Sequence, residues 1–326
     1  MNRLQVLDGW RGISILLVLA GHLFPLGYEK FQFNGPIAAT GMAIFFILSG
    51  FLITNVLLRD QDISKFLIRR FMRIVPLAWL VLLVTFLLTE VSTHEIISNL
   101  FFYSNWQPMG LTPSTSHFWS LCVEVQFYLL IALLVFLLKK KAFYLLPVLC
   151  ISITLYRYYN NVPIAINTYY RVDEILAGCA LALFYNYGAD KFKNQVGKLP
   201  TIWILFILIA SAHPATEFLN YFRPYIAALL IASTIFNKRN TWLIKALKSK
   251  LLFYIASTSY AVYIIHGGLR YTWLADGDVI EKYLKRPLFL LVTFSLSHLS
   301  TKYFESYWIS LGKKLSNKAF KKRFHE

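Results

Sequence analysis

Apolar stretches recur along nearly the whole chain, and short polar segments separate them. Ten stretches are long and apolar enough to predict membrane-spanning helices, and they lie near residues 8–25, 36–58, 74–89, 118–138, 142–157, 171–187, 201–213, 221–236, 251–269 and 287–308. The pattern predicts an all-α integral membrane protein of about ten transmembrane helices. We expect one transmembrane domain over residues 1–326, without a fused extracytoplasmic domain.

The composition supports a membrane protein. Hydrophobic residues make up 57% of the chain and charged residues only 15%, whereas soluble domains contain about 45–50% and about 25%. The three cysteines, Cys122, Cys150 and Cys179, all fall in apolar stretches. This placement predicts small buried side chains rather than a disulfide framework.

The net charge of +17 would fit a nucleic-acid-binding protein, but the positions of the basic residues indicate membrane topology instead. If the N-terminus is cytoplasmic, the inner segments contain 23 Lys and Arg residues and the outer segments contain 5. The positive-inside rule then predicts that both termini are cytoplasmic. We expect contact with anionic lipid headgroups and no nucleic-acid partner. The inner segments are 1–7, 59–73, 139–141, 188–200, 237–250 and 311–326, and the outer segments are 26–35, 90–117, 158–170, 214–220 and 270–286.

The first stretch, "DGWRGISILLVLAGH", contains ionisable residues that a lipid-facing helix would avoid. Arg11 and His22 are eleven residues apart, so they share one helix face and lie about 16 Å apart along its axis. A packing histidine that forms a hydrogen bond is one interpretation of His22. A reaction centre within the membrane is the other.

Three arginines, Arg69, Arg70 and Arg73, cluster just before Pro76, where we expect the third helix to begin. They anchor the helix at the cytoplasmic surface, or they form an anion site. Arginine binds phosphate through paired hydrogen bonds, and three arginines on about one helical turn would suit a polyphosphate. The segment "GMAIFFILSGFLIT" is rich in small residues, which permit close helix packing.

The fourth stretch opens with "HFWSLCVEVQFYLL", in which Ser120 and Glu124 share a helix face. A carboxylate at this depth needs a polar partner or a water-filled cavity. A structural ion pair is one interpretation, with Arg11 or Arg171 as the partner. The segment 90–117, rich in Pro, Ser and Thr, is expected to be a surface loop.

Weaker signals lie further along the chain, at Arg171, Asp173, Glu174, His266, His298 and Glu305. No set of His, Cys, Asp and Glu residues has a recognised metal-site spacing, so no metal is expected.

Seven segments together resemble the membrane acyltransferase 3 family, which includes polysaccharide and O-antigen O-acetylases. They are "LDGWRGISILLVLAGH", "FFILSGFLIT", "RRFMRIVP", "HFWSLCVEVQFY", "RVDEILAG", "ASTSYAVYIIH" and "YFE", in one order along nearly the whole chain. The resemblance implies that His22 is the catalytic histidine and Arg11 its essential partner. It also implies a functional acid at Glu124 and an acyl-CoA contact at Arg70 and Arg73. Many relatives have a second basic residue before Arg11, where this chain has Asp8-Gly9-Trp10, so the donor contacts stay open.

The resemblance implies an O-acyltransferase of the cell inner membrane. Its donor would be acetyl-CoA. Its acceptor would be a hydroxyl of a polysaccharide, an oligosaccharide or a lipid-linked sugar outside the cytoplasm. Direct transfer with His22 as general base and transfer through an acetyl-histidine are both compatible with the residues. A proton-coupled secondary transporter is the alternative, but we see no paired, broken helices at matching positions of two halves.

Overall fold

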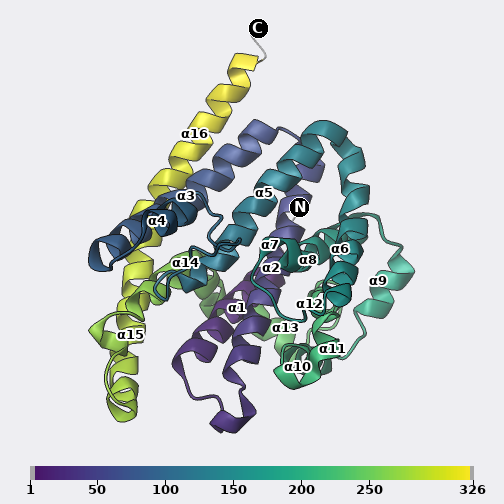
Figure 1. Ribbon diagram of the computed structural model, residues 1–326. Helices are drawn as coiled ribbons and strands as arrows, with labels where there is room; N and C mark the ends of the chain where they lie inside the picture. Colours follow the sequence, from purple (N-terminus) through teal and green to yellow (C-terminus); the bar gives the residue numbers. More distant parts are fainter. Residues whose placement is uncertain (1–3, 324–326) are drawn as a thin grey trace. The chain divides into compact units, whose positions relative to one another are not determined.

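The computed structural model describes residues 4–323, and every regular element in this part of the chain is a helix, without a strand (Figure 1). Its α-helices are α1 Gln5–Leu23, α2 Asn34–Arg59, α3 Ile63–Leu88, α4 Thr93–Leu100, α5 Trp119–Leu138, α6 Ala142–Tyr159, α7 Thr168–Arg171, α8 Asp173–Tyr187, α9 Asp190–Val196, α10 Thr201–Ser211, α11 Glu217–Asn220, α12 Arg223–Ile235, α13 Trp242–Leu247, α14 Lys250–Leu269, α15 Val279–Leu299 and α16 Ser306–Arg323. Short 3₁₀ turns lie at Glu29–Phe31, Ser116–Phe118, Lys139–Lys141, Pro214–Thr216 and Trp273–Ala275, and Ser300–Glu305 is π-helical. The ends of the predicted cytoplasmic segments, residues 1–3 and 324–326, lie outside the described residues.

Several helices are long and apolar enough to cross a membrane. Four helical stretches meet this test by length and composition alone, and two bent pairs, each with an angle of 76°, bring the number to as many as six. The chain is therefore a multi-pass membrane protein by its helices. The four stretches are Gln5–Leu23, Asn34–Arg59, Ile63–Leu88 and Ser116–Tyr159, and the pairs are α9 with α10 and Pro214–Asn220 with α12. A helix also runs through each of the ten predicted stretches.

The chain divides into two compact units. Unit 1 contains the residues up to Arg59 together with Lys140–Ala165 and Tyr169–Ser259. Unit 2 contains Asp60–Lys139, Ile166–Thr168 and the residues from Tyr260 onward.

In unit 1, α2 and α8 touch along their backbones. A Cβ atom on Gly50 would overlap the carbonyl oxygen of Ile175, and one on Gly178 would overlap the carbonyl oxygen of Ile47. Only glycine therefore fits at both positions. The close packing predicted for the small residues of "GMAIFFILSGFLIT" is confirmed here.

In unit 2, the third helix begins earlier than predicted. Asp62 caps α3 by accepting a hydrogen bond of 2.9 Å from the backbone N–H of Lys65. Pro76 therefore lies inside α3, and the expectation that the helix begins there is wrong. Asp62 is a favourable N-cap and starts the helix well before the proline. Pro76 neither begins nor ends the helix, although proline often does so. As a result, Arg69, Arg70 and Arg73 sit on a rigid helix rather than in a loop.

The segment 90–117 is not a simple surface loop, and that expectation is corrected. It contains α4, which Ser92 and Glu95 begin with a reciprocal capping box. Asn99 and Asn105 are fully buried. The Asn99 amide donates to the carbonyl oxygen of Gly110 at 2.7 Å, so buried side-chain amides hold the segment in one shape.

Candidate functional site

The predicted pair Arg11 and His22 lies on α1, in unit 1. The helix is unbroken between them, so the two residues share a face as expected. Both side chains are half-buried. The buried Trp10 anchors the N-terminal half of α1 by donating from Nε1 to Thr234 Oγ1 at 2.9 Å.

Asn34, at the start of α2, holds the end of α1 that carries His22. Its Nδ2 atom donates to the carbonyl oxygens of Gly21 at 2.8 Å and Phe24 at 2.6 Å. Its Oδ1 atom accepts from the backbone N–H of Leu26 at 3.3 Å. One amide therefore binds the last carbonyl groups of α1 and the chain that follows, which fixes the backbone around His22.

The three arginines of α3, in unit 2, have different surroundings. Arg69 is engaged by α16, because its Nε donates to Ser316 Oγ and its Nη2 to Asn317 Oδ1, both at 3.0 Å. Arg70 lies over two aromatic rings instead, with its Cζ 5.8 Å from the centre of Phe66 and 5.7 Å from that of Tyr128. Arg73 is exposed. The trio is therefore not a single cradle of equivalent groups.

Asp60 and Lys65, near the N-terminal end of α3, form an ion pair close to this trio in the sequence. Asp60 Oδ2 lies 2.5 Å from Lys65 Nζ. The hydrogen bond from the Lys65 ammonium holds the pKa of the Asp60 carboxyl below its usual value. Because the Asp60 side chain is 44% exposed, solvent screens most of this interaction.

Glu124 is buried on α5 and has a hydrogen-bond donor within its own helix. The Tyr128 hydroxyl, one turn further along, donates to Glu124 Oε1 at 2.5 Å. Tyr128 is itself buried and is the same ring that lies beneath Arg70. Unit 2 therefore brings together two of the predicted site residues, Arg70 and Glu124, through a tyrosine that the sequence reasoning did not single out. Arg171, a predicted partner of Glu124, forms an ion pair with Glu174 in unit 1.

A second polar cluster in unit 2 lies where α5 begins. The Tyr263 hydroxyl lies 2.6 Å from Ser120 Oγ and donates to the carbonyl oxygen of His117 at 2.7 Å. The rings of His117 and His266 are 5.9 Å apart, and both are buried. A Cβ atom on Gly267 would overlap the His117 ring, so glycine makes room for it. The Tyr-x-x-His-Gly spacing of α14 was the available signal for this cluster.

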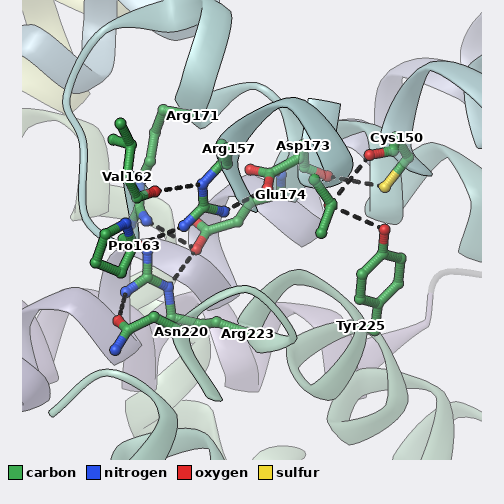
Figure 2. A network of polar contacts seen from close by, with 11 residues as sticks. Cys150, Arg157, Val162, Pro163, Arg171, Asp173, Glu174, Asn220, Arg223 and Tyr225 are labelled. Carbon is green, nitrogen blue, oxygen red and sulfur yellow. Dashed lines mark hydrogen bonds and ion pairs between the residues drawn. The ribbon is translucent and has the colours of Figure 1, made fainter. Parts of the chain in front are cut away.

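Unit 1 contains a buried ionic network that joins α6, α8 and α12 (Figure 2). Arg157 Nη1 lies 2.5 Å from Asp173 Oδ2, and Arg223 Nε lies 2.7 Å from Glu174 Oε1. Arg171 Nη1 lies 3.1 Å from the same Glu174 oxygen. All five side chains are at least 96% buried. The carboxylates were noticed in the sequence, but Arg157 and Arg223 were missed because only the fold brings them near.

The predicted site residues therefore fall into two groups. Arg11 and His22 lie in unit 1, and the three arginines with Glu124 lie in unit 2. Within residues 4–323, no group of three or more His, Cys, Asp or Glu residues is placed to hold a metal ion.

Comparison with known proteins identifies the family. The profile of the family described as "Acyltransferase domain" matches residues 4–302. The peptidoglycan O-acetyltransferase OatA of Listeria monocytogenes is 28% identical over 92% of this chain and 55% of its own length. A putative O-acetyltransferase of Staphylococcus aureus is 26% identical (86% and 53%), and the putative peptidoglycan O-acetyltransferase YrhL of Bacillus subtilis is 27% identical (80% and 47%).

The chain thus spans about half the length of the curated relatives it matches. No solved structure matches it. The profile runs through both compact units and includes every residue of the two predicted groups. The chain therefore belongs to the acyltransferase domain family, as the resemblance implied.

Proposed function

We propose that this chain is a membrane O-acetyltransferase. It transfers an acetyl group from acetyl-CoA to a hydroxyl of an extracytoplasmic or lipid-linked carbohydrate of the peptidoglycan type. Membership of the family and the names of its relatives support this proposal. In the proposal the chain crosses the cell inner membrane ten times, with both termini in the cytoplasm, as the distribution of basic residues predicts.

The main support for the proposal comes from the surroundings of the Arg70 guanidinium. Its guanidinium is half-buried over two rings, and among residues 4–323 it has no hydrogen-bond or ion-pair partner. A cation in partly apolar surroundings attracts an anion strongly, because the low local dielectric screens it poorly. The phosphates of CoA are suitable anions, and Arg73, three residues further along α3, would bind them as well. Arg69 would contribute less, because α16 already engages it.

The chemistry would take place at His22. The imidazole accepts the proton of the acceptor hydroxyl, and the oxygen forms a bond to the acetyl carbon. The carbon–sulfur bond of the thioester breaks, and the CoA thiolate takes the proton from His22. If the acetyl group passes through His22 itself, the imidazole nitrogen first forms a bond to the acetyl carbon as the carbon–sulfur bond breaks and the CoA thiolate leaves. The acceptor oxygen then bonds to the acetyl carbon as the nitrogen–carbon bond breaks, and the hydroxyl proton ends on the released CoA thiol. Arg11, on the same face of α1, would support the donor or a carboxylate, and Glu124 would hold a sugar hydroxyl.

The test uses the purified full-length chain in lipid vesicles with radiolabelled acetyl-CoA and cell-wall glycan fragments. The wild type is expected to place alkali-labile label on the glycan. A His22→Asn variant should lose about 10²–10⁴-fold in turnover and still bind CoA. Near-native turnover of the variant would show that His22 is a packing residue and not a catalytic one. If the wild type transfers no label but moves glycan or protons across the vesicle, the transporter alternative holds instead.

A further inference from the structure

We propose that Tyr128 is a positioning residue with two separate roles. Its ring holds the donor-binding Arg70, and its hydroxyl holds Glu124. This inference rests on the proposed function above and adds residues that neither the motifs nor the comparisons assign. Phe66 shares the first role.

The first role follows from the geometry around Arg70. Phe66 precedes Arg70 by one turn of α3, and its ring meets that of Tyr128 edge-on, with 6.0 Å between the centres. Both rings are buried, and the guanidinium lies within 6 Å of each. Cation–π attraction restrains the guanidinium without using its five N–H donors. The arginine is therefore held in place while its hydrogen-bonding groups stay available to a ligand.

The second role follows from the hydroxyl. Tyr128 donates to Glu124 at 2.5 Å, a distance typical of a charge-assisted bond to a carboxylate. Tyr128 and Glu124 are four residues apart on α5, so a rigid helix sets their relative positions. The bond restricts the carboxyl group to one orientation within a buried site, where an unsatisfied oxygen would be costly.

The two roles together link Arg70 to Glu124 while the Arg70 guanidinium has no ion-pair partner among residues 4–323. A direct pair would neutralise the arginine and occupy its donors. A tyrosine between the groups avoids this, because it offers a ring face to the cation and a proton to the carboxylate.

The roles can be separated by substitution. Tyr128→Phe retains the ring and removes the hydroxyl, so kcat should fall at least about tenfold while the KM for acetyl-CoA stays within about twofold. Tyr128→Leu removes both, so the donor KM should also rise by about three- to tenfold. Phe66→Leu removes one ring only, so the donor KM should rise by a few-fold at unchanged kcat.

Two further variants exclude a general packing effect. Tyr225→Phe, in unit 1, removes a half-buried hydroxyl that donates to Thr154 Oγ1 at 2.9 Å, and it should change neither kcat nor KM. In a Glu124→Gln background, Tyr128→Phe should have less effect than in the wild type, because the bond that it breaks is already weakened. Equal kinetics for Tyr128→Phe and Tyr128→Leu would overturn the role of the ring. Wild-type kinetics for Tyr128→Phe would overturn the role of the hydroxyl.

Binding of unacylated CoA to the purified chain, measured by calorimetry, gives an independent result. Tyr128→Phe should bind CoA like the wild type, and Tyr128→Leu and Phe66→Leu should bind it more weakly. If the variants bind CoA as expected relative to the wild type but the wild type transfers no acetyl group, the proposed function is wrong. The role of the Phe66 and Tyr128 rings in holding Arg70 is then supported. If the wild type transfers acetyl groups and all variants bind CoA equally, the role of the two rings is wrong and the proposed function is supported.

Discussion

The two compact units place arginine near carboxylate in opposite ways. In unit 1, Arg157 and Arg223 pair directly with Asp173 and Glu174 (Figure 2). In unit 2, Tyr128 stands between Arg70 and Glu124. Direct pairing neutralises charge and ties helices together, so the network of unit 1 is best explained as a structural tie. The indirect link leaves a cation available, so the cluster of unit 2 is the better candidate for binding.

The largest expected effect is on stability and comes from unit 1. Arg157→Ala leaves the fully buried Asp173 without its ion-pair partner, which typically costs about 3–5 kcal/mol. We expect a large drop in the thermal unfolding temperature of the detergent-solubilised chain. Arg157→Lys restores a positive charge without the planar fork and should recover part of the loss. An unchanged unfolding temperature for Arg157→Ala would contradict the structural role of the ionic network in unit 1. It would also contradict the proposed difference between the two units.

The second prediction concerns Arg70, whose removal should affect binding and leave stability nearly unchanged. Arg70→Ala should raise the KM for acetyl-CoA by about tenfold or more, because a charge-assisted phosphate contact contributes about 1.5–3 kcal/mol. The acceptor KM should not change. Added salt should raise the donor KM of the wild type more than that of the variant. An equal drop in unfolding temperature for Arg70→Ala and Arg157→Ala would erase the difference between the units.

The third prediction separates the arginines of α3. Arg69→Ala removes hydrogen bonds to Ser316 and Asn317 on α16. Because these are partly exposed contacts, we expect a loss of about 0.5–1.5 kcal/mol in stability and a smaller change in donor KM than for Arg70→Ala. Parallel unfolding and kinetic measurements on the two variants check this. A larger rise in donor KM for Arg69→Ala would reverse our assignment.

The smallest effect concerns pH. The Lys65 ammonium lowers the pKa of Asp60, so the folded state favours the ionised carboxyl. This contribution is present above the unfolded value of about 3.9 and is lost as the pH falls through the lowered folded value. Solvent exposure limits it to a few tenths of a kcal/mol. Asp60→Asn should lower stability slightly at pH 6 and by less at pH 3, and an equal loss at both pH values would contradict the shift.

The sequence predicted the helices well because hydropathy is a local property. A helix runs through every predicted stretch, and the turn at 139–141 appears where the lysines interrupt α5 and α6. The predicted start of α3 is too late because proline commonly begins a helix, whereas the cap at Asp62 starts this helix and Pro76 lies within it. The interpretation of segment 90–117 as a surface loop missed α4 and the buried Asn99 and Asn105, because Ser and Asn favour loops whether or not the fold buries them.

The site was predicted only in part, for a physical reason. The motifs named Arg70 and Glu124, but they treated Arg69, Arg70 and Arg73 as one group. Which of these faces α16 and which faces α5 depends on how α3 packs in unit 2, and this is not a property of the segment itself. The same holds for Arg157 and Arg223, whose partners are distant in sequence. The roles of Arg11 and His22 stay predictions.

The backbone contact between α2 and α8 has a consequence for how the protein is made. Gly50 on α2 and Gly178 on α8 each pack against the backbone of the opposite helix, yet α3 and α5, which belong to unit 2, are synthesised between them. At about 5–20 residues per second, α2 waits roughly ten seconds for its partner. During this time its glycine face borders lipid, the translocon or an insertion chaperone. Unit 1 can complete its packing only after α8 has been synthesised. The surface of α2 that packs against α8 must therefore stay accessible while other helices enter the bilayer.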